Sequence, residues 1–224
     1  IGFENKSFDE SRFSQQVSNY LNTDHHKKIF KEKDLINLVN EVLTKIDEPI
    51  ADPSLLPSYL ISNFAKKNVN TVITGDGADE LFGGYAPFKA IMPSKVYSKI
   101  IHPSIHKILL NLVNSIPVSH SYMSLDFKIK RSLKGLSYPS NLWNPIWMSH
   151  FSKNEIEELL MQKVNLEEIY SEAIEIWNTI DNKDEIDKSL EFYTKLYLTD
   201  NILVKIDRSS MMNSLECRAP YLDN

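Results

Sequence analysis

Residues 71–85 read TVITGDGADELFGGY, and this stretch decides how the rest of the chain is interpreted. Its first four residues have the composition of a β-strand, and Gly75 and Gly77 then favour a turn around Asp76. In an open α/β sheet, ligands bind beyond the carboxyl ends of the strands, where such a turn lets the backbone approach the ligand. The stretch therefore predicts a ligand site at the end of a strand.

Three acidic side chains crowd this strand end, namely Asp76, Asp79 and Glu80. Carboxylates in such a group repel one another, and a hard divalent cation such as Mg²⁺, shared with a phosphate, offsets their charge. A second interpretation is structural, because acids in the first turn of a helix interact favourably with its positive end. The structural interpretation explains Asp76, between two glycines, less well than the other two acids. We therefore favour a nucleotide-and-metal site.

The composition limits the classes of protein to which the chain can belong. The 224 residues are 42% hydrophobic and 25% charged, which is enough for a core in one large or two small domains. The net charge of −5 argues against a nucleic-acid partner. The single cysteine excludes an internal disulfide and, with no apolar run of membrane-spanning length and no signal peptide, favours the cytoplasm. Since neither end looks like a natural terminus, we expect a piece of a longer protein.

The first 85 residues alternate between strand-like and helix-like patterns. We expect strands at residues 1–3, 27–30 and 71–74, and helices at residues 9–21, 35–46 and 56–64. This rhythm predicts an α/β fold in which a partial parallel sheet is linked by crossover helices. A further strand before Ile1 is needed to complete that sheet.

The pattern changes after residue 85. From residue 86 to about residue 198 the periodicities predict helices and no strand. Trp143 and Trp147 are most simply explained by packing in a core. We therefore expect a nucleotide-binding α/β part over residues 1–85 and a mostly helical part over residues 86–224.

Two groups of charges allow more than one interpretation. A basic run in the helical part predicts a solvated surface in preference to a phosphate site; its members are Lys128, Lys130, Arg131 and Lys134. A second group lies near the C-terminal end and comprises Lys205, Asp207, Arg208, Glu216 and Arg218. In one interpretation Asp207 and Arg208 form structural ion pairs with the two later charges. In the other, Lys205 or Arg208 holds a substrate carboxylate, which the planar arginine fork fits.

The central stretch resembles a motif of the asparagine synthetase family, in the synthetase domain of its glutamine-hydrolysing enzymes. In that motif Ser-Gly-(Asp/Glu)-Gly-(Ala/Gly/Ser)-Asp-Glu is followed closely by Phe-Gly-Gly-Tyr, and residues 74–85 here read TGDGADELFGGY. Further matches occur at residues 1–3, 8–10, 23–26, 48–53, 205–208 and 220–223. The resemblance runs in order along the whole chain and is loosest in the helical middle. It implies a fragment of the C-terminal ATP-dependent domain, with an adenine nucleotide alpha hydrolase-like fold of the ATP-pyrophosphatase type.

The resemblance also implies a reaction. Such enzymes use ATP and Mg²⁺ to convert the side-chain carboxylate of aspartate into an acyl-adenylate, with release of pyrophosphate. Ammonia, supplied from glutamine by a separate N-terminal glutaminase domain, then attacks to give asparagine. Members of the family use the same activation to amidate sugar acids, cyclise peptides or close β-lactam rings, so the acceptor stays open. The resemblance leaves a homodimer of the full-length protein open too.

Roles in binding the nucleotide follow at the matching positions. The backbone of Ile1 is expected to lie against the adenine, while Thr74, Gly75 and Gly77 border the adenylate. Asp79 is expected to help hold the metal and the pyrophosphate. Thr74 stands where the family has serine, a change that keeps the hydroxyl.

Roles in the chemistry follow in the same way. Asp76 is implied as the general base that takes a proton from the attacking ammonia or its tetrahedral adduct. Contacts to the substrate are expected from Glu80, Lys205 and Arg208.

Two expected segments of the family lie outside the sequence. The pyrophosphate loop, Ser-Gly-Gly-x-Asp-Ser, should precede Ile1, and a lysine-bearing segment should follow Asp223. We therefore predict that the chain alone does not form the adenylate.

Two other classes of protein compete with the interpretation as a synthetase. A Mg²⁺-dependent phosphatase of the haloacid-dehalogenase type would need an Asp-x-Asp pair, which the sequence lacks. A non-catalytic module derived from a synthetase is the other.

Overall fold

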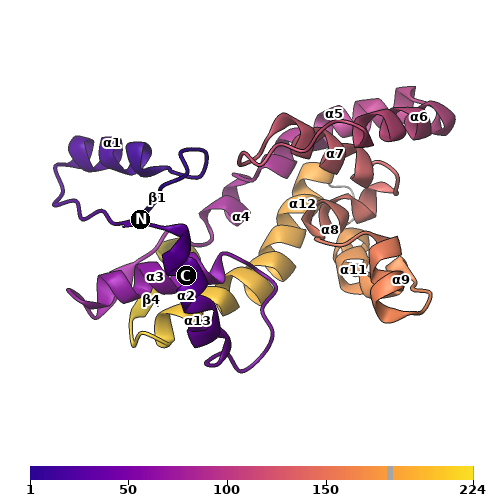
Figure 1. Ribbon diagram of the computed structural model, residues 1–224. Coiled ribbons are helices and arrows are strands. Elements are labelled where there is room, and N and C mark those ends of the chain that lie inside the picture. Colours follow the sequence, from indigo (N-terminus) through magenta and orange to yellow (C-terminus); the bar gives the residue numbers. More distant parts are fainter. Residues whose placement is uncertain (181–183, 224) are drawn as a thin grey trace. The chain divides into compact units, whose positions relative to one another are not determined.

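The computed structural model describes residues 1–180 and 184–223. These residues form mainly helices, with two small parallel sheets (Figure 1). The chain divides into two compact units. The first unit comprises Ile1–Asp76 and Asp200–Asn224, and the second comprises Gly77–Thr199. The predicted division at residue 85 into a nucleotide-binding part and a helical part stays a prediction. The compact units instead divide after residue 76, and the C-terminal residues belong to the first unit.

Both sheets belong to the first unit and contain two strands each. Strand β1 (Gly2–Phe3) pairs in parallel with β2 (Ile29–Phe30). Strand β3 (Thr71–Ile73) pairs in parallel with β4 (Glu216–Arg218), in a register that sets Cys217 opposite Val72. The three expected strands are thus confirmed. Strand β4 was not predicted from the sequence, because its residues, Glu-Cys-Arg, contain no apolar run.

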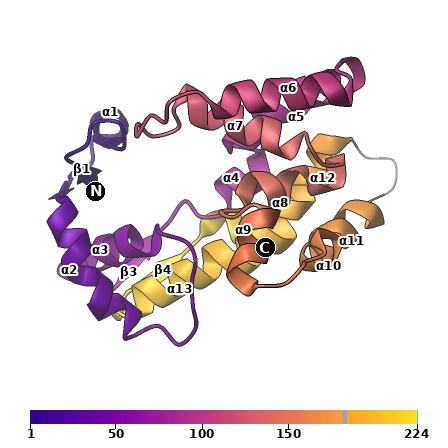
Figure 2. The same cartoon turned by 45° about the vertical axis from the view of Figure 1, so that its right-hand side comes forward.

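The helices of the first unit agree with the expected crossovers. Helix α1 (Ser11–Leu21) links the first two strands, and α2 (Glu32–Leu43) and α3 (Leu55–Lys66) lie between the second and third. Helix α13 (Val204–Met211) packs against α3, as Figures 1 and 2 show. Val42, Leu55 and Tyr59 form the buried core of this unit. The α/β prediction therefore holds in its coarse form, as a mixed and mostly helical chain with small parallel sheets.

The second unit contains helices and, among its described residues, no strand. Its helices are α4 (Ala78–Phe82), α5 (Ala86–Ile100), α6 (Pro103–Asn114), α7 (Leu125–Gly135), α8 (Trp143–Met148), α9 (Lys153–Leu160), α10 (Leu166–Ile169), α11 (Ser171–Thr179) and α12 (Glu185–Phe192). A 3₁₀ turn, η1 (Ser140–Leu142), precedes α8, and a π-helical segment, η2 (Tyr193–Leu203), follows α12. The expectation of helices without strands is confirmed for the residues that the structure describes.

The aromatic core of the second unit confirms the packing role predicted for its tryptophans. Trp143 and Trp147 are both 5% exposed and pack against Ile91, with their ring centroids 5.7 Å apart.

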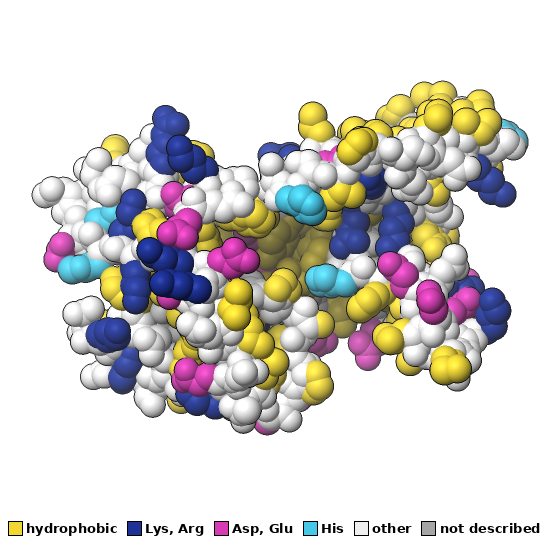
Figure 3. Space-filling view, viewed as in Figure 1, with side chains coloured by type: hydrophobic (Ala, Val, Ile, Leu, Met, Phe, Trp, Pro, Cys, Tyr) yellow, Lys and Arg dark blue, Asp and Glu magenta, His cyan; other side chains and the backbone are white. Residues whose placement is uncertain are grey.

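Apolar side chains are also exposed along α6, and Figure 3 shows them gathered over that helix. None of the helices in the described part of the chain is both long enough and apolar enough to cross a membrane.

A buried ion pair holds α13 to the segment before α3. Lys205 on α13 is 7% exposed, and its Nζ lies 3.1 Å from Asp52 Oδ2 and 2.8 Å from the Ser54 hydroxyl. Asn201 donates its side-chain amide to the same Asp52 oxygen at 3.1 Å. Burial alone would raise the pKa of Asp52, but hydrogen bonds from Ser54 and the charge of Lys205 outweigh it and leave that pKa below its ordinary value. The carboxylate therefore stabilises the fold in its charged form.

Replacing Asp52 by asparagine should therefore lower the free energy of unfolding. We expect D52N to cost about 3 kcal/mol near neutral pH, because it leaves the buried Lys205 ammonium unpaired. Since folding lowers the pKa of Asp52, its contribution is fully present above about pH 4 and is lost as the pH falls through the lower folded value. Urea unfolding from pH 7 to pH 3 should show the gap between wild type and D52N narrowing only below about pH 4.

The matched control is D47N, which changes an exposed carboxylate in the same unit. It should leave the stability nearly unchanged, because exposed pairs contribute little. A D52N protein as stable as the D47N protein would contradict the structural role of the Asp52–Lys205 pair.

Gly135 ends α7 beside the aromatic core. A Cβ atom at this position would lie 2.1 Å from Trp147 Nε1, inside the van der Waals contact distance. We expect G135A to lower the free energy of unfolding by about 2 kcal/mol, because a well-packed core does not accept an added methyl group. Gly75 offers the matched control, since a Cβ there would have no atom within 4 Å. Thermal unfolding should separate the two variants; equal melting temperatures would contradict the packing at Gly135.

Candidate functional site

The end of strand β3 leaves an open stretch of backbone in the first unit. The N–H of Thr74 donates to the Arg218 carbonyl on β4 at 2.8 Å, and its hydroxyl donates to the same oxygen at 3.4 Å. The next residue, Gly75, is exposed, and a Cβ there would meet nothing within 4 Å. The backbone at Gly75 can therefore be approached closely by a ligand, as the sequence pattern requires.

Asp76 follows directly and is half-buried. Its carboxylate forms no hydrogen bond or ion pair with any residue that the structure describes. The Asp76 carboxylate acts electrostatically on Cys217 of β4. Burial raises the pKa of that thiol, and the Asp76 charge raises it to a smaller extent. A carboxylate held at a strand end without a basic partner keeps its oxygens available to accept a proton or to bind a cation.

Two glycines in the second unit set the short helix α4. Gly77 precedes it with φ of +90° and Gly83 follows it with φ of +66°, a left-handed conformation that glycine adopts at little cost. Gly84 has a different effect, since a Cβ there would lie 2.0 Å from Asp79 Oδ1 and would displace the Asp79 carboxylate. Asp79 is exposed, and its carboxylate has no hydrogen bond or ion pair within the described residues. The glycines at positions 83 and 84 thus fix the backbone and leave room for the Asp79 carboxylate.

Glu80 has a different environment from Asp79, although both lie in the first turn of α4. It is 2% exposed, and its Oε1 accepts a hydrogen bond from the Tyr85 hydroxyl. Burial and the Glu80 carboxylate together raise the pKa of Tyr85 well above its ordinary value. The Tyr85 ring packs against Tyr193 and Tyr197, with centroids 5.2 and 5.7 Å away. Glu80 therefore helps to order an aromatic cluster, and its contact with a substrate stays a prediction.

The two predicted substrate cations of the first unit are both paired with acids. Lys205 is held by the buried ion pair with Asp52. Arg208 is one-third exposed, and its Nε lies 2.8 Å from Asp47 Oδ1 while its Nη1 lies 3.2 Å from Asp207 Oδ2. These acids hold the charge of Arg208 and raise its pKa, chiefly through the hydrogen bond to Asp47. Substrate contacts of Lys205 and Arg208 stay predictions.

The ion pairs expected among the C-terminal charges are only partly those observed. Arg218 pairs with Glu216, two residues earlier on the same strand β4, with 2.8 Å between Nε and Oε1. Arg208 does not join this pair, because its partners lie in the loop after α2 and at the neighbouring Asp207. The proposed link from Asp207 and Arg208 to the two later charges is therefore wrong, although structural pairing of this group is correct. Sequence alone gave no sign that residues 47–52 supply the partners, since these are about 150 residues away.

The carboxylates at the strand end fit a shared metal better than a closed protein cage. Within the described ranges, no group of three or more His, Cys, Asp or Glu side chains is arranged to hold a metal. A nucleotide-bound Mg²⁺ needs only one or two carboxylates, with phosphate oxygens and water completing its shell. Asp76 and Asp79 each have free carboxylate oxygens, and Gly75 leaves the backbone open. Each carboxylate, Asp76 in the first unit and Asp79 in the second, therefore fits by itself one ligand position of a nucleotide-bound Mg²⁺.

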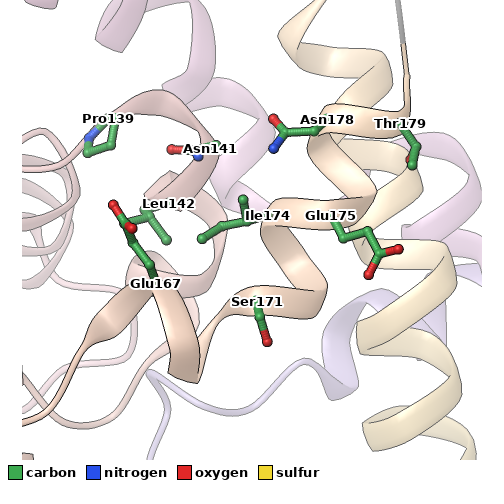
Figure 4. A pocket seen from close by; sticks show the side chains of 9 residues that line it. All are labelled: Pro139, Asn141, Leu142, Glu167, Ser171, Ile174, Glu175, Asn178 and Thr179. Atoms are coloured by element: carbon green, nitrogen blue, oxygen red, sulfur yellow. The ribbon is translucent and has the colours of Figure 1, made fainter.

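A cavity of about 580 Å³ in the second unit contains none of the predicted site residues. It lies between η1 and α11, where Figure 4 shows the side chain of Asn178 pointing toward Asn141. Glu167 and Glu175 are the charged residues of its lining. No sequence motif pointed to this cavity, since its lining comes from three short elements without a shared pattern.

Comparison with known proteins places the chain in a family. The family model described as Asparagine synthase matches residues 1–224. The chain is 27% identical to asparagine synthetase [glutamine-hydrolyzing] 1 of Bacillus subtilis, with 100% of the chain and 34% of the relative covered. It is 30% identical to putative asparagine synthetase [glutamine-hydrolyzing] 2 of Methanocaldococcus jannaschii, with 95% and 39% covered. No solved structure matches significantly.

The chain thus spans between a third and two-fifths of the length of these curated relatives. The family model nevertheless covers every residue, including the strand end at Asp76, α4 and the C-terminal segment with β4. The resemblance seen in the sequence is confirmed by this match. The chain belongs to the asparagine synthase family.

Proposed function

We propose that this chain supplies the ATP-dependent synthetase part of an amidating ligase, with an ATP-pyrophosphatase type of fold. In the proposed reaction a carboxylate attacks the α-phosphate of ATP, giving an acyl-adenylate and pyrophosphate. Ammonia then displaces AMP from the acyl carbon and leaves an amide. The side chain of aspartate is the proposed acceptor, in keeping with the names of the relatives. The observation that carries the proposal is the half-buried Asp76 carboxylate without a basic partner in the described part of the chain.

Asp76 is proposed as the general base. When ammonia adds to the acyl carbon, its nitrogen becomes positively charged and must lose a proton before the amide forms. A base does this within hydrogen-bond distance of the nitrogen. An Asp76 neutralised by lysine or arginine would be a poorer acceptor, so its lack of a basic partner supports this role.

The neighbouring residues are proposed to bind the nucleotide. The exposed backbone at Gly75 and the turn at Gly77 give the adenylate close access, with the hydroxyl of Thr74 beside them and the backbone of Ile1 against the adenine. Asp79 is proposed to hold Mg²⁺, which would neutralise phosphate charge when bound.

Three further contacts complete the proposed substrate site. Glu80, Lys205 and Arg208 are proposed to contact the substrate. Arg208 is the most accessible of them, because a third of its side chain is exposed and its acidic partners are exposed too.

Ammonia is proposed to come from a glutaminase domain of the complete gene product, which would act in the cytoplasm. The relatives' names include glutamine hydrolysis, and the chain covers only part of their length. A homodimer is compatible with this arrangement. The alternative within the family is another acceptor, such as a sugar acid, a peptide or a β-lactam precursor, and product analysis distinguishes these. A phosphatase would instead release inorganic phosphate, and a non-catalytic module would release neither product.

The 224-residue chain alone is expected to release no pyrophosphate from ATP. The physical reason is that adenylation needs groups that bind and neutralise the phosphates, and the pyrophosphate loop and the lysine-bearing segment that the family resemblance implies are not among residues 1–224. A coupled pyrophosphate assay with ATP, Mg²⁺ and aspartate tests this, with the complete gene product as the positive control. Sustained turnover by the chain alone would refute the expectation.

Replacing Asp76 by asparagine should separate the two chemical steps in the complete gene product. We expect D76N to lower amide formation by about 10²–10⁴-fold, while one equivalent of pyrophosphate is still released per enzyme. Rapid-quench measurement of both products checks this. E158Q is the matched control, since Glu158 is exposed on α9. An unchanged rate of amide formation in D76N would remove Asp76 from the mechanism, and loss of the pyrophosphate burst would place it in nucleotide binding instead.

A further inference from the structure

The basic run of the second unit is not the solvated surface that its sequence predicts. Lys128 is exposed, but Lys130, Arg131 and Lys134 are only partly exposed. These three side chains line a cavity of about 570 Å³, together with Lys153 at the start of α9. The expectation of a solvated surface is therefore correct for Lys128 and wrong for the other three. The reason lies in the tertiary structure, because the face of α7 that carries these three side chains lies beside the segment after α6 and the start of α9.

The spacing of the run explains why its charges meet. Residues three and four apart on a helix share a face, so positions 127, 130, 131 and 134 of α7 form one stripe. Helix α6, the segments before and after α7, and the start of α9 supply the rest of the lining. Four basic side chains therefore converge on one cavity, against Asp126 as its acidic member.

Two of these charges have no ion-pair partner within the described part of the chain. Arg131 forms no ion pair or hydrogen bond with the described residues, and its buried Nε atom has no partner. Its guanidinium lies over the Phe127 ring, 5.7 Å from the centroid. The side chain of Lys134 also has no ion pair or hydrogen bond in the described ranges. Burial lowers the pKa of both groups, and the charge of Arg131 lowers that of Lys134 further, which shows that the cations are desolvated and repel one another.

The other charges around the cavity are already engaged. Lys130 donates to the Ile116 carbonyl at 2.6 Å, and Asp126 accepts from the Ser119 N–H at 3.2 Å. Lys153 lies 3.8 Å from Glu157. Glu155 lies near enough to favour the charged form of Lys134, but its carboxylate is bound by the N–H and hydroxyl of Ser152. The cavity therefore holds an excess of positive charge that desolvation makes costly.

The uncharged part of the lining is mixed. Its apolar and aromatic members are Leu110, Val118, Phe127 and Tyr138, and its polar members are Asn114, Ser119, Ser137, Ser152 and Asn154. The volume is within the range of small-molecule sites, and such sites combine an apolar wall with a few placed polar groups. Arginine presents a planar fork that fits phosphate and carboxylate in two hydrogen bonds. The acidic cavity of Figure 4, lined by Glu167 and Glu175, has no such character.

We propose that the cavity between α6, α7 and α9 binds a small organic anion, with its phosphate or carboxylate group on Arg131 and Lys134 and its apolar body against Phe127 and Tyr138. The proposed aspartate amidation does not use this cavity, since none of its lining residues belongs to residues 71–85 or to the C-terminal segment. The site would be a second ligand site of the chain. It stands or falls independently of the amidation.

Titration calorimetry at low salt tests the site with phenyl phosphate as the anion with an apolar body. Inorganic phosphate, benzoate and phenol separate the contributions of the phosphate, the carboxylate and the ring. We expect phenyl phosphate or benzoate to bind at least about tenfold more tightly than phenol, because the ionic contact is worth at least that factor. Binding should weaken as salt is added, since the contact is ionic. No detectable binding of either anion at millimolar concentration, or equal binding of phenol, would overturn the proposal.

Variants locate the binding. R131Q/K134Q should weaken binding of the anion at least about tenfold, whereas R12Q/K99Q, which removes one exposed arginine and one exposed lysine elsewhere, should leave it within about twofold. R131K keeps the charge and loses the fork, so an intermediate affinity is expected. Unchanged binding in R131Q/K134Q would overturn the proposal.

Stability without ligand gives a separate readout. Because the two cations have no ion-pair or hydrogen-bond partner among the described residues, R131Q/K134Q should melt at the same temperature as the wild type or higher. A melting temperature well below that of R12Q/K99Q would show that the protein itself satisfies these cations, and would contradict the proposal.

Discussion

The parallel pairing of β3 with β4 is the constraint on which the first unit depends. It joins Thr71 to Glu216 across 145 residues of sequence, and the Arg218 carbonyl at its end accepts hydrogen bonds from the Thr74 N–H and hydroxyl. Without β4, the backbone before Gly75 would have no fixed direction, and the carboxylate of Asp76 would not be held at a strand end. Closing so long a loop is entropically costly, which makes the buried contacts of α13 with α3 necessary.

Those contacts are of two kinds, and they differ in what they specify. The apolar core around Val42 and Tyr59 supplies burial that many sequences could supply. The Lys205–Asp52 pair, with Ser54 and Asn201, is specific to one arrangement, because a buried charge without its partner is strongly destabilising. The cation that the sequence made available for a substrate therefore has an architectural role in the observed structure.

Elsewhere in the chain, charges lack such partners. Among the described residues, Asp76 and Asp79 carry carboxylates without an ion-pair partner, and Arg131 and Lys134 carry partly buried cations without one. A folded protein usually pairs its buried charges, so the partly buried Asp76, Arg131 and Lys134 point to ligands. The signs differ: an unpaired acid such as Asp76 suits a cation, and the basic cavity suits an anion. Glycines lie next to the acids in the sequence, and aromatic rings lie beside the cations of the basic cavity.

The sequence by itself determined the family, the strand–turn–helix order around Asp76 and the helical character of residues 86–180, because these depend on local periodicity and on glycines whose conformations are fixed by neighbouring residues. Only the tertiary structure decided which charges are paired. The partners of Lys205 and Arg208 come from residues 47–54, and the basic face of α7 became a cavity wall through segments that no periodicity links to it. The physical reason is that a side chain's charge is readable from its type, whereas its desolvation and its partners depend on which distant segments fold against it.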